Sequence, residues 1–216
     1  MGTITRSFAN NITTSGVLLP ASLTNNSIAN VTAYNASVST GGMVLLSTQT
    51  ASNSASISFT TGIDSTYKEY QFYLINMGAR TDGAILGFNG STDAGSNYNV
   101  AKTSTFFKAY HREDGSGGDI LYRTSHDLAQ GTGNQNITED QSTSADDNIC
   151  SILTIYNPSS TTYVKHYIGQ TSEVNYAENQ NQLYAGYMNT TSAINAIRFS
   201  MTSGNFDGTI LLFGIK

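Results

Sequence analysis

Three histidines and a small set of carboxylates are the residues of this sequence that could do chemistry. His111, Asp114 and His126 could supply ligands to a metal ion, but no pair has the His-x-x-x-His spacing that preorganises such ligands. A Ser-His-Asp triad stays open because its members need not be neighbours in sequence, yet there is no Gly-x-Ser-x-Gly motif to present a nucleophile. We interpret these residues, and His166 within an expected strand, as polar groups at strand ends and turns. We therefore expect no catalytic residue, no metal site and no cofactor.

The carboxylates are concentrated in turns. Residues 114–119 superficially suggest a calcium loop but lack its acidic one-three-five spacing and closing Glu, so we interpret them as a Gly-rich hairpin. Residues 129–147 form the longest stretch of turn-forming residues and are interpreted as a solvated loop, although their acids could meet a cation or a basic partner. Those acids are Glu139, Asp140, Asp146 and Asp147. No acid pair stands out for glycosidic cleavage, so replacing Asp114, Asp119, Glu139 or Asp140 by Ala is expected to leave assembly nearly unchanged.

The composition favours strands and turns as the elements that position these groups. Among the 216 residues, Thr, Ser and Asn number 28, 26 and 21, which is 75 residues, and only 12% of the chain is charged. The 13 Tyr and 9 Phe supply bulky material for a core. Such a chain is poor helix material, so a helical bundle is excluded and an all-β fold is expected.

The charge and cysteine content limit the partners. A net charge of −5 with 10 Lys and Arg residues argues against nucleic acid, because phosphate binding draws on clustered cations. No apolar stretch approaches a membrane span, and the first residues lack the apolar core of a signal peptide, so we expect a soluble, unexported protein. Cys150 stands alone between Ile149 and Ser151 and is expected to be a small buried hydrophobic residue.

Residues 1–41 differ from the rest of the chain. Their only charge is Arg6, and they have too little apolar content for a core of their own, which predicts an extended arm that docks on a partner surface. Without charges, the arm must attach through backbone hydrogen bonds and apolar contacts, as a strand added to an exposed sheet edge does. The predicted contact residues are Ile4, Phe8, Ile12, Leu18 and Leu19.

From residue 42 to residue 216 the chain reads as one β-sandwich domain. Alternation of polar and apolar residues, as in 56–60 and 69–75, predicts half-buried strands. Eleven are expected, at 43–47, 56–60, 69–75, 84–88, 104–110, 119–123, 148–156, 161–170, 182–188, 194–201 and 209–215. Asn157-Pro158-Ser159-Ser160 predicts a hairpin turn. So many short strands with turns between them indicate an antiparallel, jelly-roll-like β-sandwich.

Three phrases of the sequence resemble proteins of tailed double-stranded DNA phage particles. Residues 56–72 contain an "S-I-x-F … I-x-x-x-Y-x-x-Y-x-F" hairpin, which opens a β-sandwich in that group. Residues 95–100 (Gly-Ser-Asn-Tyr-Asn-Val) are similar to a second phrase, and residues 206–216 end in a "G-T-I-x-L-F-G-I" strand. The resemblance covers roughly residues 42–216.

The resemblance implies a structural virion protein and transfers no catalytic residue. The leading hypothesis is a capsid decoration or cement protein that binds other virion proteins on the head exterior as a homotrimer, after assembly in the host cytoplasm. The alternative is a tail fibre, spike or receptor-binding appendage, in which exposed tyrosines and the 129–147 loop meet host glycans. A small glycan hydrolase is the weakest reading. The candidate tyrosines are Tyr67, Tyr98, Tyr110, Tyr176 and Tyr187, with core or interface packing as the default for each.

Overall fold

The computed structural model describes residues 12–13, 16–17 and 42–216. The chain divides into two units, Met1–Gly42 and Met43–Lys216. In the first unit, β1 (Ile12–Thr13) pairs antiparallel with β2 (Gly16–Val17). The second unit carries all the features described below.

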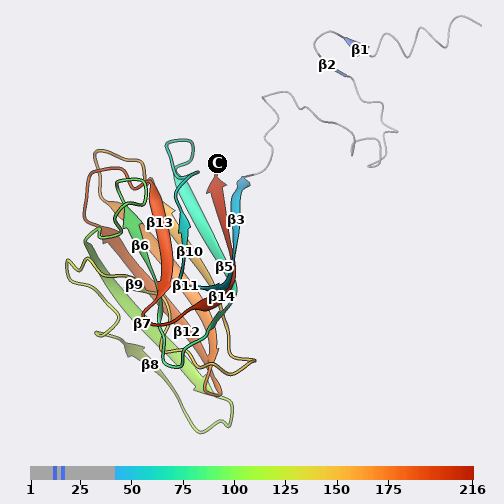
Figure 1. Cartoon of the computed structure of the whole chain (residues 1–216), viewed down its shortest axis with the longest axis vertical. Helices are drawn as coiled ribbons and strands as arrows, with labels where there is room; N and C mark the ends of the chain where they lie inside the picture. The colour runs from blue at the N-terminus through green and yellow to red at the C-terminus, as the bar shows by residue number, and fades with distance from the viewer. Residues whose placement is uncertain (1–11, 14–15, 18–41) are drawn as a thin grey trace, which may run out of the picture. The chain divides into compact units, whose positions relative to one another are not determined.

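A broad antiparallel sheet of eight strands forms one layer of the second unit (Figure 1). Its order is β3-β14-β5-β10-β11-β12-β7-β8, so the strands next to the C-terminal β14 are β3 and β5. Their bounds are β3 (Met43–Ser54), β14 (Phe206–Ile215), β5 (Glu69–Ala79), β10 (Ile149–Tyr156), β11 (Lys165–Asn175), β12 (Glu178–Met188), β7 (Lys102–Arg112) and β8 (Gly118–Tyr122). Most of these pairings join distant segments of the chain.

A smaller antiparallel sheet forms the other layer. It has the order β4-β13-β6-β9, with β4 (Ser56–Phe59), β13 (Ala196–Met201), β6 (Leu86–Ser91) and β9 (Gln135–Asn136). The predicted all-β antiparallel sandwich is therefore confirmed, and the part of the chain that the structure describes contains no helix. All eleven expected strands are present, whereas the two-residue β9 was not predicted.

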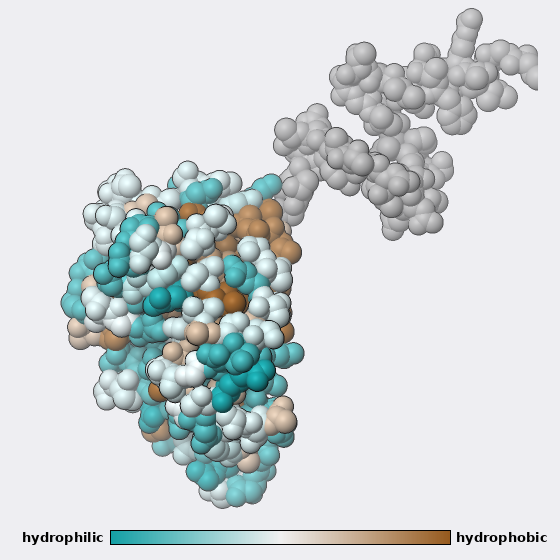
Figure 2. All heavy atoms as spheres, viewed as in Figure 1, coloured by the Kyte–Doolittle hydropathy of each residue, from teal (hydrophilic) through white to brown (hydrophobic). Residues whose placement is uncertain are grey.

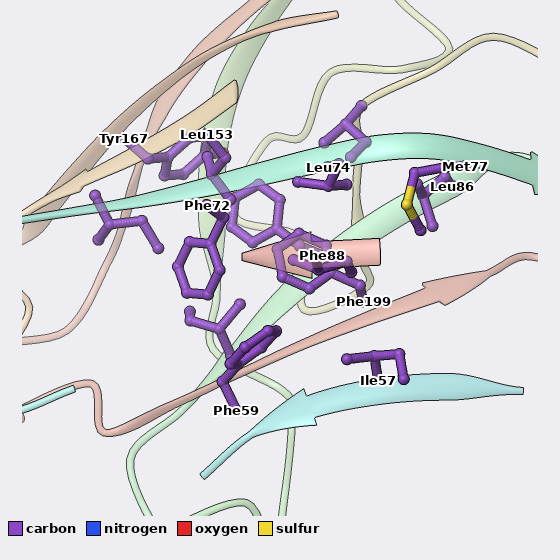
Figure 3. Packing of buried hydrophobic residues seen from close by; sticks show 14 of the residues in the cluster. Ile57, Phe59, Phe72, Leu74, Met77, Leu86, Phe88, Leu153, Tyr167 and Phe199 are labelled. Carbon is purple, nitrogen blue, oxygen red and sulfur yellow. The ribbon is translucent and has the colours of Figure 1, made fainter. Parts of the chain in front are cut away.

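The core lies between the two sheets and is built around aromatic rings. The alternation predicted in β5 places Phe72 on the inside, where its ring meets those of Phe59 and Phe199, with both pairs of centroids 5.3 Å apart (Figure 3). Phe88 packs edge-on against Tyr167 at 5.1 Å. All five side chains are buried. Burying one such side chain contributes about 1.5–3 kcal/mol, so this cluster holds the two sheets together.

One glycine lets the inner side of the eight-stranded sheet accommodate a large ring. Gly169 in β11 lies opposite Tyr184 in β12, and a Cβ built on Gly169 would stand 2.1 Å from the Tyr184 ring. The Tyr184 hydroxyl lies 3.2 Å from the Ser151 hydroxyl, so the buried phenol is hydrogen-bonded. Burial raises the pKa of Tyr184, which keeps this phenol neutral.

Candidate assembly surface

The outer face of the eight-stranded sheet carries many large apolar side chains. Because side chains alternate along a strand, the neighbours of the core residues point away from the small sheet. The exposed apolar residues of this face are Leu45, Ile75, Phe107, Ile120, Tyr122, Ile152, Ile168, Val174 and Leu183. In Figure 2, hydrophobic residues come to the surface along the side where β3 lies. A face with this many exposed apolar side chains is a candidate interaction site.

This outer face is also nearly free of charge. The basic residues within the eight strands are Lys102, Lys108, Arg112 and Lys165, and they alternate in phase with buried side chains such as Phe106 and Tyr167. They therefore lie on the inner side, where Lys102 and Lys165 are buried. The outward strand positions include the carboxylates of Glu69 and, at one end of β14, of Asp207, which is paired with Arg80 at 2.6 Å.

The apolar side chains line up across the strands. Residues directly opposite each other in successive pairs form one row from β14 to β8, which we call the cross-strand row. Its members, in order, are Leu211, Tyr73, Ile152, Gln170, Leu183, Phe107 and Tyr122. The Phe107 and Tyr122 rings lie 5.2 Å apart at an interplanar angle of 74°. Directly opposite residues form the closest side-chain contacts in a sheet, so the row is an apolar band interrupted at its centre by Gln170.

A hollow of about 520 Å³ lies on this face over β5, β10, β11 and β12. Tyr73, Ile152, Ile168 and Leu183 line it, together with Cys150. The prediction that Cys150 is buried was wrong, because Ile149 and Ser151 occupy the inward positions and turn the thiol outward. A hollow with an apolar lining fits apolar side chains of a partner better than it fits a polar ligand.

The contact residues predicted for the arm fall largely outside the described residues. This applies to Ile4, Phe8, Leu18 and Leu19. Ile12 begins β1, but its side chain is likewise outside the described part of the chain. The attachment role of the arm stays a prediction.

The histidines are not brought together. His126 is buried against the Phe106 ring, with centroids 5.0 Å apart, whereas His111 and His166 are exposed on the outer face. Burial lowers the pKa of His126, whose Nε2 lies 3.9 Å from Glu139. Over residues 12–13, 16–17 and 42–216, no group of three or more His, Cys, Asp and Glu side chains could hold a metal ion.

The interpretation of residues 129–147 as a solvated loop was wrong for their middle part. Gln135 lies in β9, and Ile137, Thr138 and Glu139 are buried. Glu139 is held by Arg123, whose Nε and Nη2 donate to its two carboxylate oxygens at 2.8 and 2.7 Å. The polar composition gave no sign of this burial, because the segment satisfies its polar groups through distant partners.

Glu173 is the second buried carboxylate near this segment. It accepts hydrogen bonds at Oε2 from Gln182 Nε2 at 2.7 Å and from the Glu139 backbone N–H at 3.3 Å. Its Oε1 and the Oε1 of Gln182 have no hydrogen-bond partner among the described residues. Burial raises the pKa of Glu173 to about 8, so it holds a proton at neutral pH. This carboxyl group lies in the core and is not open to a substrate.

Of the five candidate tyrosines, Tyr176 is the one with a mostly exposed ring. Tyr98 is covered by the Arg198 guanidinium, 4.4 Å from its ring centre, and Lys108 lies over Tyr110. Tyr67 packs edge-on against Tyr70. Core packing, the default interpretation, therefore accounts for Tyr67, whereas the rings of Tyr98 and Tyr110 are covered by cations.

Comparison with known proteins leaves the function to be argued from these residues. No family model, curated protein or solved structure matches the chain. Among the described residues there is no helix long and apolar enough to cross a membrane. The apolar outer face was missed by the sequence reasoning. The unbroken apolar run at residues 210–213 in β14 was a usable signal, because a strand with one solvated face should alternate.

Proposed function

We propose that the chain is a non-enzymatic structural protein of a tailed-phage particle, a capsid decoration or cement protein that attaches to the head exterior as an oligomer. The observation that carries this proposal is the apolar, nearly uncharged outer face of the eight-stranded sheet. Soluble monomers rarely expose such a face to water, whereas a subunit of an assembly buries it against its neighbour. The virion setting rests on the resemblance of residues 56–72, 95–100 and 206–216.

The candidate acids support a structural role. Glu139 and Glu173 are buried, and Glu139 is neutralised by Arg123. Asp114 lies at the exposed turn between β7 and β8, where it accepts a hydrogen bond from the Ser116 N–H, and Asp119 is exposed within β8. Hydrolysis of a glycosidic bond needs two carboxyl groups facing each other across a cleft, and these acids do not supply such a pair.

Copy number per particle tests the head location. A decoration protein is present in hundreds of copies, whereas a tail component is present in a few tens or fewer. Gel densitometry or mass spectrometry of purified particles, calibrated against the major capsid protein, measures this ratio. Hundreds of copies support the proposal, and a few tens or fewer contradict it.

A second experiment tests the predicted attachment through residues 1–41. A chain that begins at Gly42 is expected to fold but to leave particles that lack the wild-type protein uncoated. Binding by the full chain is expected to be insensitive to salt, because Arg6 is the only charge in this segment. Co-sedimentation with particles measures both effects. Full occupancy by the shortened chain would show that the sandwich carries the attachment itself.

A tail appendage that recognises host glycans is the second candidate, and Tyr176 is the observation that favours it. This residue lies at the turn between β11 and β12, where Tyr176 and Ala177 both have positive φ, at 50° and 62°. Its exposed ring stands next to Asp82, to which its hydroxyl donates at 2.8 Å. Strained residues of this kind gather at functional sites, and a ring beside a carboxylate suits a sugar.

Binding to host-cell polysaccharide tests this second candidate. Tyr176→Ala should abolish binding, while Tyr163→Ala, at a comparably exposed ring away from this turn, should retain it. Equal binding by the two variants, or no binding by the wild type, would contradict a glycan site at Tyr176.

A further inference from the structure

The cross-strand row reads almost the same in both directions. Gln170 stands at its centre. Moving outward, Ile152 on one side matches Leu183 on the other, both branched aliphatic residues, and Tyr73 matches Phe107, both aromatic. Leu211 and Tyr122 close the two ends. When a second row runs in the opposite direction, each aliphatic residue next to Gln170 therefore meets an aliphatic residue, and each aromatic residue beyond it meets an aromatic residue.

We propose that two copies of the chain pack these outer faces against each other across a two-fold axis that runs between the faces, parallel to β11 and over Gln170. This inference rests on the proposed function and names the partner that covers the face. The axis reverses the row, so Leu183 of the second copy lies against Ile152 of the first, and Phe107 against Tyr73. Such an interface is isologous, with the same patch on both subunits.

The size of the face fits a stable interface. The six strands from β14 to β7, each about 4.8 Å wide, cover about 29 Å, and seven residues along each strand cover about 23 Å. The product is roughly 670 Å² per copy, or about 1,300 Å² in total, which falls in the range of specific interfaces. A smaller partner would leave part of the row exposed to water.

The charge distribution selects a neutral partner. Since the outward strand positions hold no lysine or arginine and the row holds no charge at all, a strongly charged partner would lose hydration without gaining an ion pair. A second copy avoids this cost because its face is equally neutral. It also supplies Leu183 and Ile152 side chains to the hollow over β10, β11 and β12, which is lined by the same residues.

The residues on the axis are compatible with self-contact. The axis runs over three consecutive outward positions of β11, which are Ile168, Gln170 and Ser172. Each of these residues would face the same residue of the second copy. Gln170 makes one long internal hydrogen bond, from Nε2 to Asn181 Oδ1 at 3.4 Å. Its carboxamide has both a donor and an acceptor, so two of them can bond to each other across the axis. Because a face that packs on itself closes with two copies, the inference replaces the expected trimer with a dimer.

Charge substitution at Gln170 tests the axis directly. Gln170→Glu and Gln170→Lys each place two like charges opposite each other in the full-length chain, and each should weaken dimerisation by roughly a hundredfold or more. An equimolar mixture of the two variants should restore a dimer, because Glu then meets Lys. Analytical ultracentrifugation over a concentration series measures the dissociation constants. Asn99→Asp, an amide-to-acid change at an exposed position outside the sheet, is the control and should dimerise like the wild type.

Rescue by the mixture is the decisive result, since residue 170 of one copy meets residue 170 of the other only when a two-fold axis passes over Gln170. Should a charged variant fail to fold, Gln170→Cys in a Cys150→Ser chain replaces it. Facing sheets lie about 10 Å apart, too far for a disulfide, so a short bismaleimide should link the two copies through position 170.

Several outcomes would overturn the inference: a wild-type monomer or trimer, dimers unaffected by both charges, or monomeric variants that the mixture does not restore. The proposed function is tested separately by co-sedimentation with particles. A wild-type monomer that still coats the head in hundreds of copies would refute the dimer and leave the decoration role standing.

Discussion

Replacing Glu173 by Gln is expected to change how the free energy of unfolding depends on pH. Glu173 is buried, its pKa is raised to about 8 by burial, and its ordinary value is 4.5. The folded state therefore holds a proton that the unfolded state releases above pH 4.5. The contribution of this group to stability is fully present below pH 4.5 and is lost as the pH rises to 8.

The size of the effect follows from the two pKa values. Their difference is 8 − 4.5 = 3.5, which sets an upper limit of about 5 kcal/mol on the loss, since each pKa unit corresponds to about 1.36 kcal/mol. With the same values, the loss is about 1 kcal/mol at pH 5, about 3 at pH 7 and about 4 at pH 8. Gln cannot ionise, and its carbonyl oxygen still accepts the hydrogen bond from Gln182, so the variant should keep its stability over this range.

Urea unfolding of both proteins at pH 5, 7 and 8 measures this difference. Taking variant minus wild type at each pH removes the contributions of the other titratable groups. Glu113→Gln, at an exposed turn position, is the matched control and should show no pH-dependent difference. A difference that stays constant from pH 5 to pH 8, or a variant that is less stable than the wild type at pH 8, would refute the reasoning.

Three further predictions concern the core. Burial lowers the pKa of Lys102 to about 7, so the folded state releases a proton that the unfolded state keeps, and wild-type stability should rise between pH 7 and pH 9.5. Lys102→Met should abolish this rise, which thermal melts at the two pH values measure. Gly169→Ala should lower the free energy of unfolding in urea by roughly 1–3 kcal/mol or more, because the added Cβ would collide with the buried Tyr184 ring. Gly78→Ala is the control and should lower it far less, because nothing lies within 4 Å of its Cβ position. Equal losses would contradict the packing of Gly169 against Tyr184. Arg123→Ala leaves the buried Glu139 carboxylate unpaired and should lower the free energy of unfolding by about 3–5 kcal/mol. Glu139→Ala should lower it less, because the Arg123 side chain can reach solvent. A larger loss for Glu139→Ala than for Arg123→Ala would contradict this account.

The last of these predictions replaces the expectation that Glu139→Ala leaves assembly nearly unchanged. From the sequence, Glu139 is one of several acids in a polar stretch with Gly, Asn and Ser around it. In the fold it pairs with Arg123, and its own backbone N–H donates to Glu173 in β11. These partners lie 16 and 34 residues away in sequence, so no local pattern could identify the pair.

The candidate assembly surface was accessible to sequence reasoning only in part. The strands that form it were predicted, and the apolar run at residues 210–213 in β14 was visible. The cross-strand row, however, brings together side chains from seven strands whose order along the sheet does not follow their order in the chain. Pairing register decides which residues stand opposite each other, and register depends on contacts between distant segments.

The sequence by itself determined the class of structure and the positions of the strands. Alternating apolar residues, aromatic and β-branched content, and turns rich in Gly and Asn are local properties, and they located eleven strands of the sandwich. Where the alternation is weak, as in β10, only the tertiary structure decided which side of the strand is buried. Ile149 and Ser151 face the core, so the Cys150 thiol between them faces outward. The physical reason is that a strand has two faces and its sequence records both, while the small sheet covers one face of the large sheet and leaves the other uncovered.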